Sequence, residues 1–430
     1  MARREKPTFV VLGGALLALL VGWAVLRSGT GGHAGDFPLY EDYARRCLDG
    51  QWPYRDFFVE YPPLSLLVMI LPALPAGPYE LWFALEMAAC ATGTLALTLK
   101  IADLVDANRM YVTAAFTLGL LALSVHPPRF FDLAPTGLVV ATVLLLLRGR
   151  ARASGIVMAL AVLTKVFPLV LVPVAGIWLV ATHGHRAAMR AGAAFGLVLL
   201  AGIALAVAVS ATGVVDMIEF HLDRPAQVHS TPAVLLRLGD FFGVGAPRTQ
   251  SSFGSDNVVG AGGALLIAAG TLAIGLVLLA LTVRLHRALS DQMASTSAAR
   301  WSLVAGCFGA VVATVVLGKV LSPQFLIWQA PVLGLLAGRR EWRAGGLLLA
   351  AMLLTSLDTG ATYSRLVDGD GLAIAVVAVR NLLLGALLAE LWGQMNTRGH
   401  SQTCRPWSGR PSTQRTSPGS WRSHSGGKPA

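Results

Sequence analysis

The chain has little charge for its size. Only 13% of its 430 residues are Asp, Glu, Lys or Arg, and 55% are hydrophobic. Soluble globular domains carry about 25% charged residues, so this chain lacks the polar surface that a water-soluble protein of its length needs. The scarcity argues against a soluble nucleic-acid-binding protein, although the formal net charge is +11. The composition therefore predicts an integral membrane protein.

Cysteine and nucleotide-binding loops are also scarce. The chain has four cysteines, which are scattered without the spacing of a metal or redox site. It also lacks a phosphate-cradling P-loop and a Gly-rich dinucleotide loop after a strand. We therefore expect no disulfide framework, no nucleotide cofactor and no nucleic-acid partner.

Long apolar runs are abundant, and a helix needs roughly 20 apolar residues to cross a bilayer. The runs predict an all-α polytopic membrane protein with about 10–13 transmembrane helices, counting broken half-helices. The run at 154–180 is interrupted by Lys165 and Pro168, which predicts two half-helices, and the run at 64–74 is too short to span. The principal further runs lie near residues 8–26, 79–101, 110–125, 191–211, 258–283, 301–317, 324–337, 344–357 and 372–392.

The basic loops give these spans a direction. Lys and Arg collect in short cytoplasmic loops, and every loop that this reading places inside contains arginine. The reading predicts a multi-pass plasma-membrane protein with both termini in the cytoplasm: a terminal segment at 1–7, a transmembrane domain at 8–393 and a disordered tail at 394–430. The first run exceeds the length of a signal-peptide core, which favours a retained helix over a cleaved one.

Polar and aromatic residues gather in the predicted outer loops, mainly 27–63 and 212–258. In the first loop, apolar residues from Tyr40 to Leu48 recur at helical spacing, which predicts an amphipathic helix suited to lying on the membrane surface. Asp36 directly precedes this helix. It is either an N-cap or a catalytic base held at the membrane face.

Four segments carry a resemblance to a known family. They are Asp36-x-x-x-Tyr40 with the following Gly50 to Leu64, Leu163 to Pro168, His221 to Ser230, and Leu321 to Trp328. In order and placement they resemble GT-C type membrane glycosyltransferases, most closely the actinobacterial polyprenyl-phosphate-mannose-dependent α-mannosyltransferases. The resemblance spans roughly residues 8–393. It implies a GT-C fold, Asp36 as catalytic base, and a sugar donor, mannose, carried on polyprenyl phosphate.

Transfer from a lipid phosphate needs one base for the acceptor hydroxyl and cations for the departing phosphate. A single displacement inverts the anomeric carbon and requires no second carboxylate. Donor-phosphate candidates are the isolated cations Lys165, Lys319, Arg224, His221 and Arg380, with Arg129 ranked lower. Candidates for contact with substrate are Tyr40, Tyr54, Glu60, Tyr61 and Gln324.

Plainer interpretations stay open for these residues. Lys165 and Lys319 fit snorkelling lysines near helix ends, Arg224 and His221 fit solvated loop residues, and the aromatics fit interfacial side chains. Glu41, Asp42, Asp56 and Glu60 could add a metal site with Asp36, but no spacing demands one, and we expect no obligatory metal.

Two functions from different classes compete. The first is a glycosyltransferase whose partners are membrane lipids, a polyprenyl-phosphate-linked sugar and a glycolipid or glycan acceptor. The second is a transporter or flippase of a lipid-linked sugar, which would favour internal repeats and polar groups at the bilayer midplane. The polar residues lie at one face instead, which favours the first. Acceptor, linkage and oligomeric state are left open by the sequence.

Overall fold

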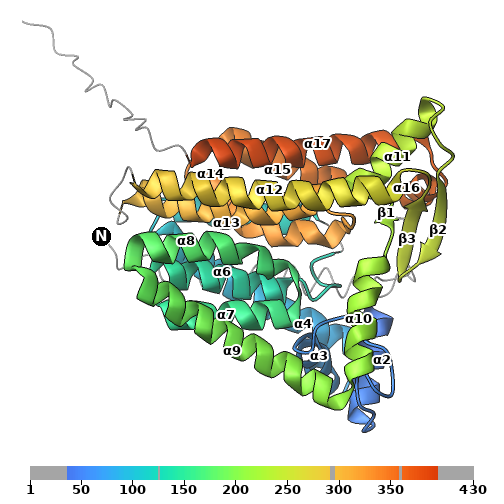
Figure 1. The fold of residues 1–430 in the computed structure, drawn as a ribbon, viewed down its shortest axis with the longest axis horizontal. Helices are drawn as coiled ribbons and strands as arrows, with labels where there is room; N and C mark the ends of the chain where they lie inside the picture. Colours follow the sequence, from blue (N-terminus) through green and yellow to red (C-terminus); the bar gives the residue numbers. More distant parts are fainter. Residues whose placement is uncertain (1–35, 124–125, 291–295, 358–360, 396–430) are drawn as a thin grey trace, which may run out of the picture. The chain divides into compact units, whose positions relative to one another are not determined.

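The computed structural model describes residues 36–123, 126–290, 296–357 and 361–395 (Figure 1). The predicted first helix at 8–26, the N-terminal segment and nearly all of the predicted tail lie outside these residues. The first half of the described chain holds α2 (Phe37–Leu48), α3 (Ser65–Ile70), η1 (Leu71–Ala73), α4 (Tyr79–Ala102), α5 (Arg109–Ala122), α6 (Leu133–Leu147), α7 (Ala151–Thr164), η2 (Phe167–Leu171), α8 (Val172–His183) and α9 (His185–Val209). The second half holds α10 (Ala211–Asp223), β1 (Ala226–Gln227), α11 (Thr231–Phe241), β2 (Arg248–Ser252), β3 (Ser255–Val259), α12 (Gly263–Ser290), α13 (Ser297–Leu317), η3 (Pro323–Gln329), α14 (Ala330–Gly338), α15 (Trp342–Ser356), α16 (Ala361–Val367) and α17 (Gly371–Gln394).

Five of these helices, α4, α9, α12, α13 and α17, are long and apolar enough to cross a membrane. Five shorter apolar segments accompany them: α5, α6, α7, η2 with α8, and α15. Most of α13 is buried by its neighbours, whereas few residues of the apolar windows of α9 and α12 are buried. Exposed apolar surface on this scale is typical of helices that face lipid. The predicted membrane-type helical character is therefore confirmed.

The break at Lys165 is also confirmed. Helix α7 ends at Thr164, and Lys165 takes an extended conformation with φ −157° and ψ 139°. Pro168 lies in the first turn of η2, where its missing N–H costs no hydrogen bond. The interruption places the Lys165 side chain at the junction of two half-helices, away from the regular turns of either.

The segment predicted to be the long outer loop, 212–258, departs from the all-α prediction. Besides α10 and α11, it forms a three-stranded antiparallel sheet in the order β1-β3-β2. The β2–β3 turn is made by Phe253 and Gly254, both with positive φ. The strands are polar, with few buried apolar residues, so the alternating pattern that reveals a half-buried strand is missing.

Helix α2 has the predicted amphipathic character, but its apolar face does not lie on lipid. Phe37 and Tyr40 pack on Phe83 of α4, with ring centroids 5.2 and 5.6 Å apart. Tyr43 lies against Phe57 in the following loop, at 5.7 Å. The prediction of a surface-lying apolar face is therefore wrong, because these large rings are covered by protein. This packing fixes the start of α2, and with it Asp36.

Candidate functional site

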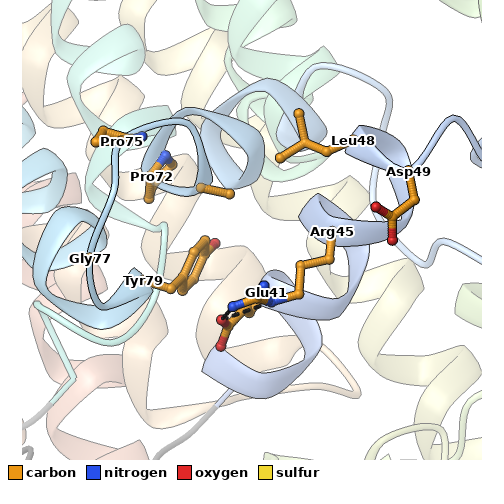
Figure 2. Close-up of a pocket in the computed structure, with 9 residues that line it drawn as sticks. Glu41, Arg45, Leu48, Asp49, Pro72, Pro75, Gly77 and Tyr79 are labelled. Carbon is orange, nitrogen blue, oxygen red and sulfur yellow. Dashed lines mark hydrogen bonds and ion pairs between the residues drawn. The ribbon is translucent and has the colours of Figure 1, made fainter.

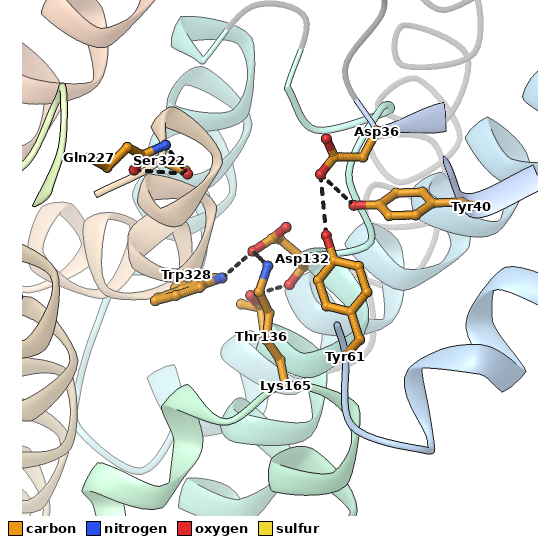
Figure 3. A network of polar contacts seen from close by, with 9 residues as sticks. All are labelled: Asp36, Tyr40, Tyr61, Asp132, Thr136, Lys165, Gln227, Ser322 and Trp328. Carbon is orange, nitrogen blue, oxygen red and sulfur yellow. Dashed lines mark hydrogen bonds and ion pairs between the residues drawn. The ribbon is translucent and has the colours of Figure 1, made fainter. Parts of the chain in front are cut away.

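Asp36 lies at the N-cap position of α2, but its carboxylate makes no capping hydrogen bond to the described first turn. Its Oδ2 atom instead accepts hydrogen bonds from the hydroxyls of Tyr40, at 3.1 Å, and Tyr61, at 3.4 Å (Figure 3). The N-cap interpretation therefore does not account for this side chain. The carboxylate is aimed at a tyrosine pair rather than at its own helix.

The surroundings of Asp36 alter its basicity. Burial raises the pKa of this carboxyl above its ordinary value of 3.8, because the charged form loses solvation. The positive charge of Lys165 and the hydrogen bond from Tyr40 oppose the increase without cancelling it. A carboxylate with a raised pKa accepts a proton more readily than an exposed aspartate does.

Beside this carboxylate lies an ion pair that the sequence reading missed. Lys165 Nζ donates to Asp132 Oδ1 at 2.7 Å, and Trp328 Nε1 donates to the same oxygen at 2.6 Å (Figure 3). The side chain of Asp132 is 0% exposed, and that of Lys165 is 15% exposed. Asp132 directly precedes the apolar helix α6. A charged residue in or beside an apolar run needs a partner of opposite charge. Asp132 and Lys165 are two such residues, and this complementarity was the available sequence signal for the pair.

Aromatic rings surround the Lys165 ammonium. Its Nζ lies 4.7 Å from the ring centroid of Phe131, 5.3 Å from that of Phe325 and 5.5 Å from that of Trp328. Phe167 stacks on Trp328 at 3.8 Å. These contacts and the ion pair fix the ammonium in place, so the snorkelling interpretation does not describe Lys165.

Helix α10 packs on the segment between α2 and α3 and contacts Glu60. The Nε2 atom of His221 lies 2.7 Å from the backbone carbonyl oxygen of Glu60. The Tyr54 hydroxyl donates to the Tyr61 carbonyl at 2.7 Å, which orders the same segment. Gly213 allows the close approach, because a Cβ atom there would collide with the Tyr54 carbonyl. Burial raises the pKa of Glu60 and lowers that of His221.

Two further predicted cations lie near His221. Arg224 donates to Ser255 Oγ at 2.7 Å, and its Nε is buried without a hydrogen-bond partner among the described residues. Lys319 Nζ donates to the Leu222 carbonyl at 2.6 Å. Burial lowers the pKa of both groups, and the charge of Arg224 lowers that of Lys319 further. The structure therefore brings together three of the five predicted phosphate-binding residues.

The segments that carry these cations are joined to η3. The backbone N–H of Gln227 donates to the Lys319 carbonyl at 2.9 Å. Its side-chain Nε2 donates to Ser322 Oγ at 2.8 Å (Figure 3). Gln324 is half-buried on η3, the same short helix that carries Phe325 and Trp328. With the contacts of His221 to Glu60 and of Phe167 to Trp328, all four segments that suggested the family resemblance are thus in contact.

Arg380 lies in a different cluster. Its side chain is 1% exposed and donates to the His229 carbonyl at 2.7 Å. It also bonds Asn381 Oδ1, and Asn381 in turn donates to the His229 carbonyl at 3.2 Å. These contacts tie α17 to the segment before α11. They give Arg380 a structural role, whereas its predicted phosphate contact stays untested.

A cavity of about 290 Å³ opens beside α2 (Figure 2). It is lined by Glu41, Arg45, Leu48, Asp49, Pro72, Ala73, Pro75, Gly77 and Tyr79. None of the predicted site residues is among them. The Glu41–Arg45 ion pair lies at its surface, so the cavity belongs to the polar face of α2.

Within the described ranges, no three His, Cys, Asp or Glu side chains come together as a metal site. The expectation of a metal-independent reaction stays a prediction.

Fold and site together define a helical protein with membrane-spanning character and a half-buried carboxylate near the Lys165–Asp132 ion pair. No family model matches the chain, and no match was found among the curated proteins.

Proposed function

We propose that this chain is an integral membrane glycosyltransferase of GT-C type. In this proposal it moves a sugar, mannose, from a polyprenyl phosphate to a hydroxyl of a glycolipid or glycan at the outer face of the plasma membrane. The observation that carries the proposal is the Asp36 carboxylate. It is half-buried, makes no capping hydrogen bond, and lies near the positive charge of Lys165.

The reaction is a single inverting displacement. The acceptor hydroxyl gives its proton to the Asp36 carboxylate while its oxygen bonds to the anomeric carbon of the donor sugar. The bond between that carbon and the phosphate oxygen breaks, and the electron pair leaves with the polyprenyl phosphate. The raised pKa of Asp36 suits this role, because its carboxylate accepts a proton more readily than an exposed aspartate does.

The leaving phosphate needs positive charge, and the candidate cations differ in how much net charge they can supply. Lys165 is already neutralised by Asp132, so its net contribution is small, although its ammonium has further N–H donors to offer. Arg224, with a buried Nε that lacks a partner in the described chain, and Lys319 are better placed to supply net charge. A buried donor without a partner costs free energy, and a bound phosphate oxygen would remove that cost.

The test is Asp36→Asn in full-length protein reconstituted into liposomes with labelled polyprenyl phosphomannose and a membrane extract. We expect transfer to fall at least ~100-fold, the usual worth of a general base. The pKa of Asp36 is higher in the folded protein than in the unfolded chain. The ionised form of Asp36 therefore disfavours folding. The variant should therefore unfold at no lower temperature than the parent at neutral pH.

Asp49→Asn is the matched control, since Asp49 is an exposed acid at the other end of α2. It should keep full activity. Full transfer by Asp36→Asn would refute the base assignment. Label that crosses the bilayer with no new glycan would favour the transporter or flippase instead.

A further inference from the structure

The C-terminal half of α11 and the turn after it carry a group of exposed apolar side chains. Phe241 and Phe242 are 84% and 77% exposed and pack on each other edge to face. We call the whole set the α11 tip. It consists of Leu235, Leu238, Phe241, Phe242 and Val244, all of them exposed.

The other face of α11 anchors the helix in the protein. Ala233, Val234 and Leu236 are buried in a small core with Ala373 and Val377 of α17. The Thr231 hydroxyl donates to the carbonyl of Val316, near the end of α13. The base of α11 is therefore fixed at the end of the bundle where α12 and α17 begin and α13 finishes. All three are long enough to span a membrane.

The tip extends away from this anchored base (Figure 1). Burial falls along α11 from Pro232 to Phe241, as the helix leaves the first turns of α12 and α17. The exposed apolar surface continues on α12 at Leu265 and Leu272. The base of α11 thus lies where α12 and α17 start, and the tip extends from it at the same end of the molecule as the exposed Leu265 of α12.

The single cation of α11 is turned away from the tip. The Arg237 guanidinium bonds Thr249 Oγ1 and the Val367 carbonyl, between β2 and the end of α16. The tip therefore keeps its apolar residues together, with Asp240 as its one charged neighbour on the helix. Aromatic side chains concentrate at the boundary between lipid headgroups and acyl chains. A helix with one apolar face can lie in that boundary.

We propose that the α11 tip is a membrane anchor, which inserts Phe241 and Phe242 into the interface of the leaflet at the N-terminal ends of α12 and α17. The anchor holds α11, and through it the Ser230–Thr231 junction and the sheet, at a fixed height on the membrane. Its occupant is lipid, because the tip and the neighbouring helix α12 both expose apolar side chains and α12 is long and apolar enough to cross a membrane.

The experiment measures the depth of the tip in full-length protein reconstituted in phosphatidylcholine–phosphatidylglycerol liposomes. Phe242→Cys, in a background with the four native cysteines changed to serine, is labelled with a small fluorophore and quenched by lipids that carry a nitroxide. Gln250→Cys, at an exposed position of β2, is the matched control. No substrate is added, so the result is independent of sugar transfer.

We expect nitroxide lipids to quench the Phe242→Cys label at least threefold more than the Gln250→Cys label, and aqueous iodide to show the reverse order. Leu238→Cys, on the same stripe, should behave like Phe242→Cys and guards against a local defect at one position. Equal, weak quenching by lipid at all three positions, with full access to iodide, would overturn the anchor. So would protection from both quenchers, which would mean that protein covers the tip.

Discussion

Asp36 is the residue on which the proposed chemistry depends, and the hydrogen bond from Tyr40 lowers its pKa. The Tyr40 hydroxyl favours the ionised carboxylate by a hydrogen bond of 3.1 Å. Tyr40→Phe should therefore raise the pKa of Asp36 further. Activity needs the ionised carboxylate, so the acid limb of kcat/KM against pH should move to higher pH, with a fall of about tenfold per pH unit below it.

The control for this shift is Tyr43→Phe, since Tyr43 is also on the buried face of α2 but packs on Phe57. Its profile should follow that of the parent. Tyr61→Phe should shift in the same direction as Tyr40→Phe but by less, because its hydrogen bond of 3.4 Å is longer. An acid limb at the parent position in both Tyr40→Phe and Tyr61→Phe would show that Asp36 does not set the pH dependence.

The Asp132–Lys165 ion pair should contribute to the stability of the folded protein. Removing one partner of a buried pair leaves the other charge uncompensated, which typically costs about 3–5 kcal/mol. Asp132→Ala should therefore lower the free energy of unfolding by about 3 kcal/mol. Asp132→Ala/Lys165→Met removes both charges and should recover at least half of that loss, as measured by reversible denaturation in detergent.

Asp103→Ala provides the comparison, because Asp103 forms an exposed ion pair with Arg109. Exposed pairs are worth about 0–1 kcal/mol, so this variant should be nearly neutral. Equal losses in Asp132→Ala and Asp103→Ala would mean that the central pair is not a buried electrostatic unit.

At the scale of elements, α10 connects the segment between α2 and α3 to the sheet, and Gly213 makes its approach possible. Gly213→Ala places a methyl group against the Tyr54 carbonyl, so α10 or the loop must move. That movement should disturb the contact between His221 and Glu60 and lower transfer at least ~10-fold, since misplacement of about 1 Å can cost far more. Helical content by circular dichroism should not change.

Gly196→Ala on α9 serves as the control, because nothing lies near its added Cβ. It should keep full activity and unfold at an equal or slightly higher temperature, as alanine favours helix over glycine. Unimpaired transfer by Gly213→Ala would mean that the packing of α10 on the first loop does not matter for the site.

The elements also show which features could be predicted from the sequence. The lengths of the apolar runs predicted α4, α13 and α17. Lys165 and Pro168 predicted the break between α7 and α8, because proline interrupts a helix through its own local geometry. The partner of Lys165 is 33 residues away in sequence, and no local pattern joins two single charges. The β-sheet escaped prediction because its polar strands are stabilised by pairing rather than by an apolar face.

The amphipathic helix α2 illustrates the same division. Spacing alone predicted both its existence and its apolar face. Whether lipid or protein covers that face depends on Phe83 and Phe131, which come from distant segments. The same limit applies to Asp36, since its position before a helix was visible in the sequence but its contact with Tyr61 was not.

For the whole molecule, the proposed direction in the membrane can be measured across a single helix. Gln250 lies before α12, and Arg287 lies near its end; both are exposed. The 28 residues of α12 extend about 42 Å, which exceeds a hydrocarbon core of about 30 Å. If α12 spans and basic residues mark the inside, the two positions lie on opposite sides of the membrane.

We expect an impermeant maleimide added to intact cells to label Gln250→Cys and not Arg287→Cys, each in the background without native cysteines. Permeabilised cells should label both, which controls for access to the thiol. The result also bears on the proposed chemistry, because Gln250 lies in the same segment between α9 and α12 as His221 and Arg224. Arg224 also contacts Ser255 of β3, the strand that pairs with β2. Labelling of Arg287→Cys alone in intact cells would mean that the protein has the opposite orientation. Asp36 would then face the cytoplasm, and a nucleotide sugar would replace the lipid-linked sugar as the expected donor.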